Sequence, residues 1–172
     1  MCKLWSSIIE FWDKKYNLSV ETKTKGATAL ELDVLGSYVG QNFPEAFRVV
    51  YKMHNGCDEY IIYPHPSRFL STQEILNQWN YFNQVFSNNL GEELEFNKML
   101  HSKEVKSVRW NKHWIPFAIC TRGRDFYCLD FDPTEFGVKG QIIFFSIDLG
   151  DRTFISKSFE YWMTEIYSIT NK

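Results

Sequence analysis

The sequence has no run of apolar residues long enough to cross a membrane, which takes about 20 such residues in a helix. It also lacks a secretory signal peptide. The apolar stretch near the start is interrupted by Ser6, Ser7 and Glu10 and has no small-residue cleavage site. Only four cysteines are present, without a Cys-x-x-Cys pair, so we expect free thiols and not a disulfide framework. These absences predict a cytoplasmic protein.

Positive charge is not in excess either. The chain carries 19 Lys and Arg against 21 Asp and Glu, a net charge of -2, whereas general nucleic-acid affinity needs a surplus of cations. The motifs GxSxG, GxGxxG and GxxxxGK[ST] are missing, and the four histidines form no HxH or HExxH pattern. We therefore predict no enzyme activity, no cofactor, no metal and no nucleic-acid partner.

Aromatic residues are abundant. They make up 17% of the chain and include six Trp and fifteen Phe. A chain of 172 residues most often forms one domain, and at this size folding buries about 70% of the surface that the unfolded chain exposes. We predict a single domain over residues 1–172 with an aromatic core, and some aromatic side chains left for a partner surface.

Helical spacing of apolar residues predicts two helices near the start of the chain. The first covers about residues 3–15, and Leu30, Val34 and Leu35 mark the second. Gly40 follows the second helix and is expected to close it in a left-handed conformation, which glycine adopts without a steric cost. The polar stretch between the two helices is predicted to be a loop.

A third helix is predicted to begin at Pro44, because the first helical position does not need a backbone N–H. Phe47, Val50 and Tyr51 would form its buried face, and Gly56 would end it.

A fourth helix is predicted after Ser71, which forms a capping box with Glu74. Before it, residues 60–63 have the composition of a short β-strand. Residues 87–110 show no clear periodicity, so they are either an exposed loop or a peripheral helix around 92–100.

The last third of the chain has strand character. Aromatic and β-branched runs at 114–120 and 126–132 are separated by a short turn, which predicts a hairpin. A further strand is predicted at 141–147 and a short one at 154–155, before a helix capped by Ser158. The order of elements predicts an α+β fold with a twisted, mostly antiparallel sheet and helices packed on it.

Two groups of residues and a closing helix resemble the signatures of a known family. The first signature is a glycine, an apolar residue and proline, an acid, then a helix ending in Asn-Gly; it corresponds to Gly40, Phe43, Pro44, Glu45, Phe47, Tyr51, Asn55 and Gly56. The second is a Trp-Ile-Pro-Phe-Ala strand, a turn and two further strands; it corresponds to Trp114, Ile115, Pro116, Phe117, Ala118, Gly123, Asp125, Leu129, Asp130, Phe131, Asp132, Pro133, Gly140, Gln141 and Ile142. The closing helix contributes Ser158, Phe159 and Trp162.

In this order the residues resemble the SUKH superfamily, over about residues 30–162. The superfamily includes bacterial immunity proteins and the fungal Smi/Knr regulators of cell-wall assembly. One departure is Arg124, which stands between the glycine and the aspartate of the turn. The resemblance implies a cleft for partner recognition and no catalytic activity. It favours an immunity protein that binds a cognate toxin, with a regulatory scaffold as the alternative and an uncharacterised hydrolase as a less favoured third interpretation.

Five residues are the candidates for partner contact; they are Trp114, Asp125, Asp130, Asp132 and Glu135. The last four lie in the stretch 125–148, which is rich in acids that could meet a basic toxin. Asp130 and Asp132 are two apart in a predicted strand and would share one face. Two such carboxylates could receive a partner's basic residues, bind a cation or act as an acid/base pair. They could equally be a solvated residue and a turn before Pro133.

Three weaker patterns remain open. Cys120 and Cys128 could face each other across the hairpin in a zinc site, although structural zinc usually takes close ligand pairs. Cys57 could be an exposed thiol. The basic and aromatic run at 103–113 could bind nucleic acid, but a solvated loop explains it as well.

Overall fold

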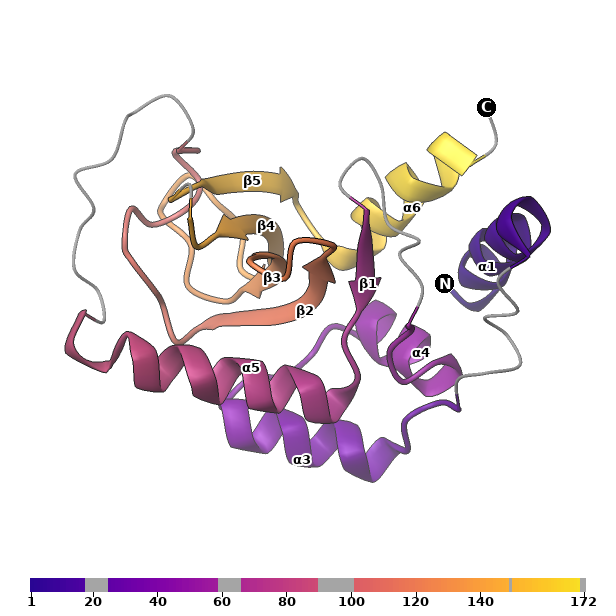
Figure 1. Cartoon of the computed structure of the whole chain (residues 1–172), viewed down its shortest axis with the longest axis horizontal. Coiled ribbons are helices and arrows are strands. Elements are labelled where there is room, and N and C mark those ends of the chain that lie inside the picture. Colours follow the sequence, from indigo (N-terminus) through magenta and orange to yellow (C-terminus); the bar gives the residue numbers. More distant parts are fainter. Residues whose placement is uncertain (18–24, 59–65, 90–100, 149, 171–172) are drawn as a thin grey trace.

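The computed structural model describes residues 1–17, 25–58, 66–89, 101–148 and 150–170 (Figure 1). The helical elements in these ranges are α1 (Cys2–Tyr16), α3 (Ala29–Val39), α4 (Glu45–Met53), α5 (Thr72–Val85), the short 3-10 helix η1 (Ser87–Asn89) and α6 (Phe159–Thr170). The strands are β1 (Ser67–Phe69), β2 (Trp114–Cys120), β3 (Asp125–Asp130), β4 (Gln141–Ser146) and β5 (Arg152–Ser156). Within these ranges, no helix combines the length and the apolar character that crossing a membrane requires.

The five strands form one sheet in the order β1-β2-β3-β4-β5, and every neighbouring pair is antiparallel. The predicted α+β fold with an antiparallel sheet is therefore confirmed. Two predicted strands extend one or two residues too far, since β3 ends at Asp130 and β4 at Ser146. The three-residue strand β1 was not predicted, because so short a segment carries no periodic pattern.

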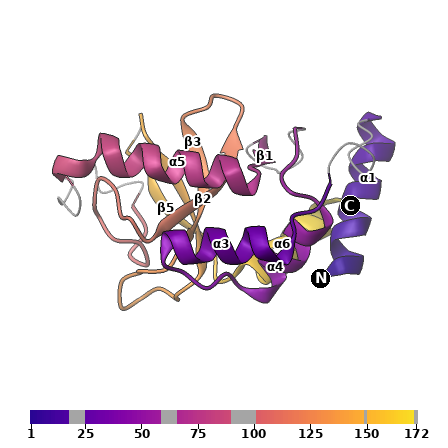
Figure 2. The ribbon, with the colours of Figure 1, turned by 90° about the horizontal axis from the view of Figure 1, so that it is seen from below.

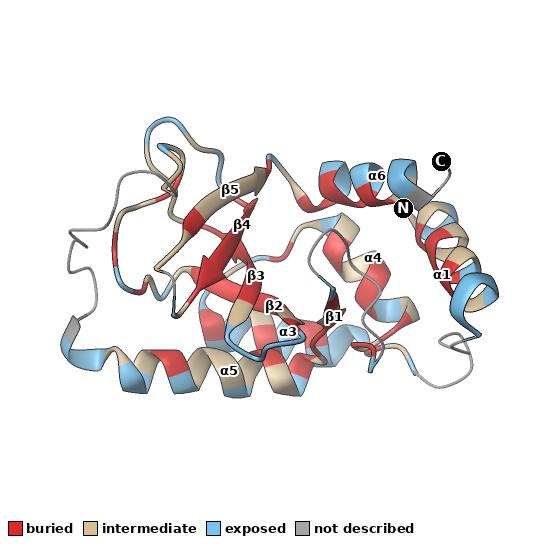
Figure 3. Cartoon of the chain, turned by 45° about the horizontal axis from the view of Figure 1, so that its top comes forward, coloured by how far each residue is buried: buried red, intermediate tan, exposed pale blue. Residues whose placement is uncertain are grey.

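Both faces of the sheet are covered, which explains the continuous apolar runs in the central strands. In β3, Tyr127 and Leu129 belong to one buried cluster, whereas Phe126 and Cys128 belong to a second cluster on the opposite face. Strand β4 alternates in the same way. Figure 3 shows β3 and β4 as almost entirely buried, whereas β5 at the edge of the sheet is mostly of intermediate burial.

The first core lies between the sheet and helices α1, α3, α4 and α6, and it includes Ile75 of α5. The second core is smaller. It is closed by Phe82 of α5 and by Val105, Val108 and Trp110 from the segment that precedes β2. The segment 101–113 therefore covers one face of the sheet although it contains no helix and no named strand.

The predicted start of α5 and end of α3 are confirmed by their caps, whereas α4 ends at Met53 with His54 as its C-cap and not at the predicted Gly56. Ser71 and Glu74 form the predicted capping box at α5, and Gly40 ends α3 at a φ of 68°. Pro44 lies one position outside α4, as its N-cap residue, and Phe47, Val50 and Tyr51 are buried as predicted.

On α3, two of the residues that marked the helix do not face the core. Leu30 and Val34 are exposed. The third marker residue, Leu35, is buried together with Leu32 and Val39. The strand predicted at 60–63 and the helix considered at 92–100 lie outside the described residues.

Helix α1 packs beside α6 and α4 at one end of the molecule (Figures 1 and 2). It buries Trp5, Ile8, Ile9 and Trp12, which recur at helical spacing. The indole Nε1 of Trp5 donates a hydrogen bond of 2.8 Å to Nδ1 of His54, just after α4. This bond joins α1 to the C-cap residue of α4.

The substitution Trp5→Ala tests how firmly α1 is attached. We expect it to lower the free energy of unfolding by about 3–5 kcal/mol, because it leaves a cavity and removes the donor to His54. Urea unfolding followed by fluorescence measures the change. Tyr81→Ala, at a residue that is 54% exposed, is the matched control. A loss at Trp5 no larger than the loss at Tyr81 would show that α1 contributes little to the fold.

Candidate functional site

Two segments far apart in the sequence meet at one face of the molecule. The side-chain nitrogen Nε2 of Gln41, in the connection from α3 to α4, lies 2.8 Å from Nδ1 of His113. In the same region the ring of Phe43 contacts the ring of Phe131, with the ring centroids 6.3 Å apart. These contacts fix the α3–α4 connection against the segment 101–113 and the end of β3.

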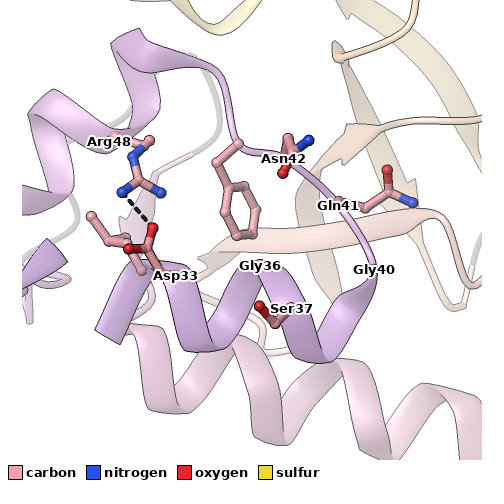
Figure 4. A pocket seen from close by; sticks show the side chains of 9 residues that line it. Asp33, Gly36, Ser37, Gly40, Gln41, Asn42 and Arg48 are labelled. Carbon is pink, nitrogen blue, oxygen red and sulfur yellow. Dashed lines mark hydrogen bonds and ion pairs between the residues drawn. The ribbon is translucent and has the colours of Figure 1, made fainter. Parts of the chain in front are cut away.

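A groove of about 530 Å³ runs between α3 and the α3–α4 connection (Figure 4). We call it the α3 groove; its walls are Leu32, Asp33, Gly36, Ser37, Gly40, Gln41, Asn42, Phe43 and Arg48. Asp33 and Arg48 close one end with an ion pair of 2.7 Å. Gly36 is needed at the base of the groove, because a Cβ there would lie 2.8 Å from the carbonyl oxygen of Gln41.

A second hollow, of about 440 Å³, lies on the other side of His113. We call it the lysine cleft; its walls are Lys106, Val108, Trp110, Asn111, Lys112, His113 and Asp132. Oδ1 of Asp132 accepts a hydrogen bond of 2.7 Å from Nζ of Lys106, and Oδ2 accepts one of 2.9 Å from the amide of Asn111. Burial alone would raise the pKa of Asp132, but these two hydrogen bonds outweigh it and lower the pKa.

Asp130 lies beneath the lysine cleft and is completely buried. Its two oxygens accept hydrogen bonds of 2.9 Å from the backbone N–H of Asp132 and from Nε2 of Gln141. Burial raises the pKa of Asp130 to about 6, although both hydrogen bonds act in the opposite direction. Gln141 also donates to the carbonyl of Glu104 and accepts from the backbone N–H of Val138. Asp130 and Gln141 therefore connect β3, β4 and the two neighbouring loops.

Arg152 holds the middle of the segment 101–113. Its side chain is buried, and the guanidinium donates to the carbonyl oxygens of Val108, Arg109, Ser146 and Asp151. The same group lies 4.1 Å from the ring centre of Phe145. Burial lowers the pKa of Arg152 to about 9.

The loop between β3 and β4 is rigid in its backbone but carries exposed apolar side chains. Phe136 is 60% exposed and Val138 is 55% exposed. The backbone N–H of Thr134 donates to the carbonyl of Glu104, and a Cβ on Gly137 would lie 2.5 Å from that same oxygen. The loop is thus packed directly against the segment 101–113, with Phe136 and Val138 facing outward.

Two of the five predicted contact residues are inaccessible. Trp114 and Asp130 are both 0% exposed, so neither can touch a partner in this structure. Trp114 packs edge-on against Trp110 in the second core. The sequence prediction was wrong for these two residues because both faces of the sheet are covered, one of them by the segment 101–113.

The acidic region predicted at 125–148 is divided between two ends of the sheet. Asp125 begins β3 and Asp130 ends it, a separation of about 17 Å along the strand. Asp148 lies near the Asp125 end, where it pairs with Arg124 at 2.6 Å. Glu135 is exposed in the loop at the opposite end. Asp125, Asp132 and Glu135 therefore remain candidates for contact, but they do not form one acidic rim.

The predicted possibilities for the cysteines are contradicted. Cys128 pairs with Pro116 and Cys120 with Ser67, and the two sulfur-bearing side chains lie in different cores. Cys57 is buried, not exposed. In the described ranges, no three His, Cys, Asp or Glu side chains gather in a metal-binding arrangement.

The aromatic residues of the basic run are also unavailable for stacking on nucleic-acid bases. Trp110 and Trp114 are completely buried. The run is neither a solvated loop nor a stacking surface, since its apolar residues close the second core while Lys103 and Lys112 stay exposed. Arg152 was missed in the sequence, because it precedes the short strand predicted at 154–155 and begins a strand with only two apolar residues.

A protein-family model described as the SMI1 / KNR4 family (SUKH-1) matches residues 26–165. The chain belongs to this family. No curated protein is significantly similar to it. The SUKH-1 match extends from just before α3 into α6, so α1 lies outside the matched region.

Nine residues were assigned to the family motifs from the resemblance, and all but Pro116, which lies inside β2, occupy turns or element ends; they are Gly40, Phe43, Pro44, Asn55, Gly56, Pro116, Gly123, Pro133 and Gly140. The glycines at 40, 56, 123 and 140 all have positive φ values. Asn55 links α4 to α5, because its side chain exchanges two hydrogen bonds with Thr72. Pro116 lies where the pairing of β2 and β3 shifts register.

The pKa of Asp130 predicts a characteristic dependence of stability on pH. The buried carboxyl keeps its proton to about pH 6 in the folded state and to about pH 4 when unfolded. Its titration should therefore reduce the free energy of unfolding as the pH rises from about 4 to about 6.5, by an amount on the order of 3 kcal/mol. Asp130→Asn should remove this decrease, which urea unfolding at both ends of the range measures.

Asp132→Asn is the control of opposite sign, because the pKa of Asp132 is lowered in the folded state. In the parent, ionisation of Asp132 raises the free energy of unfolding as the pH rises through the pKa of an unfolded aspartate. Asp132→Asn lacks this gain, so its free energy of unfolding should fall below that of the parent over the same range. Equal pH slopes in the parent and in Asp130→Asn would contradict the assignment of Asp130 as a buried carboxyl.

Proposed function

We propose that this chain is an immunity protein that neutralises a cognate bacterial toxin, such as a nuclease, by direct binding in the cytoplasm. It would act as a non-catalytic protein-binding domain. Membership of the SMI1 / KNR4 family (SUKH-1) supports protein–protein recognition as the general role. Neutralisation needs no reactive group, because covering an essential surface of the toxin is sufficient.

The rigid, outward-facing β3–β4 loop is the observation that carries the proposal. Exposed aromatic side chains on a fixed backbone are typical anchors of tight protein interfaces, since little conformational entropy is lost on binding. Phe136 and Val138 belong to the loop that follows Asp132 of the lysine cleft, and the contact between Gln41 and His113 joins this cleft to the α3 groove. Together these features give a contoured surface, and a stable complex requires about 800 Å² on each partner.

A protection assay tests the proposed function. Cells that express a toxin encoded beside the gene for this chain should grow only when the chain is co-expressed. An inactivated form of the toxin should form a one-to-one complex with the purified chain. Absence of both protection and complex formation would contradict the immunity role. Several weak cellular partners in place of one tight partner would indicate the regulatory scaffold that the family resemblance allows.

We expect Phe136→Ala to weaken the toxin complex by about 2 kcal/mol, roughly thirtyfold in Kd, because the exposed ring would fill a pocket on the partner. Isothermal titration calorimetry measures the change. Tyr161→Ala is the matched control, since Tyr161 is an aromatic residue of α6 that is 47% exposed. An unchanged Kd for Phe136→Ala would exclude the β3–β4 loop from the interface.

A further inference from the structure

The lysine cleft carries two lysines against one acid. Asp132 accepts one hydrogen bond on each carboxylate oxygen, from Lys106 and from Asn111. An ammonium group has three N–H donors, so Lys106 keeps donors beyond the one that it gives to Asp132. Because Lys106 and Lys112 together outnumber Asp132, positive charge is in excess in the cleft.

Two further groups add to the donors. Lys112 is exposed at the edge of the cleft, and its carbonyl accepts a hydrogen bond of 2.8 Å from Nε1 of Trp79, which fixes the backbone there. The amide of Gln41 donates to Nδ1 of His113. When Nδ1 accepts this bond, a neutral imidazole carries its proton on Nε2. His113 can therefore offer this N–H as a donor in addition to the two lysines.

Part of the cleft's lining is apolar, because two of its lining residues, Val108 and Trp110, also belong to the second core. The neighbouring β3–β4 loop adds Phe136, and the ammonium of Lys103 lies 5.2 Å from the centre of its ring. A ligand that fits must combine acceptor groups of negative charge with apolar surface.

We propose that the lysine cleft binds an acidic segment of a partner protein, with an Asp or Glu carboxylate directed at Lys106, Lys112 and His113 and apolar residues beside Phe136. This inference rests on the proposed function and specifies the partner's chemistry. It reverses the expectation of a basic partner, because Asp130 is buried and the ion pair of Asp132 with Lys106 leaves the charge of Lys112 in excess.

A nucleic acid fits this cleft less well than an acidic peptide. General affinity for a phosphate backbone needs a surplus of cations, whereas the chain as a whole has a net charge of -2. Trp110 is buried and cannot stack on bases. A peptide needs only a local match of charge and apolar surface.

The test uses a fluorescent peptide of alternating Glu and Leu residues, a Lys-Leu peptide of the same length, and a single-stranded oligonucleotide of equal charge to the first. Fluorescence polarisation should show saturable binding of the Glu-Leu peptide only. NMR amide shifts should change at residues 106–113 and 132–138. Lys112→Glu should weaken binding about tenfold or more, and Lys112→Gln by an intermediate factor.

Lys14→Glu is the matched control, because Lys14 is exposed on α1 and the substitution changes the net charge equally. It should alter the Kd by less than about twofold. Equal losses for Lys14→Glu and Lys112→Glu, no binding of the Glu-Leu peptide, or tighter binding of the oligonucleotide would each overturn the proposal. Protection from a toxin that survives Lys112→Glu would leave the immunity role intact and reject this cleft as its site.

Discussion

The buried guanidinium of Arg152 is the interaction on which the proposed binding surface depends. Removing this charge from water costs several kcal/mol unless its donors are satisfied, and here they meet four main-chain carbonyls. Two of these carbonyls belong to Val108 and Arg109, in a segment with no helix of its own. The arginine therefore substitutes for the regular hydrogen bonding that the segment 101–113 lacks, and holds it against the second core.

A second polar junction acts nearer the start of the same segment. Asp130 and Gln141 join β3 and β4 to the carbonyl of Glu104 and to the β3–β4 loop. Val105, Val108 and Trp110 also bury their side chains against the sheet. Because these two junctions and the buried side chains hold the segment, its lysines extend from a constrained backbone. Preorganisation of this kind reduces the entropy that a partner complex loses.

The regular elements could be predicted from the sequence because their signals are local. Capping residues such as Ser71 and Gly40 are read within one turn of helix, and the strands from β2 onward are marked by continuous aromatic and β-branched runs. The placement of side chains in the site could not be predicted, because burial depends on what packs against each face of the sheet. A solvated Asp130 was one interpretation of the sequence, whereas in the structure its carboxylate is completely buried and bonded to Gln141 and to the backbone of Asp132. The same contacts bring His113 to Gln41, 72 positions away.

The most direct test of this account is backbone amide exchange in Arg152→Met, with Arg152→Lys for comparison. In Arg152→Met, the amides of Val105 and Val108 should exchange at least about tenfold faster than in the parent, while those of β2, β3 and β4 should keep their protection. Lysine should restore part of the protection, since it cannot reproduce the guanidinium geometry. Unchanged exchange at Val105 and Val108, or equal acceleration throughout the sheet, would contradict the claim that Arg152 fixes the binding surface.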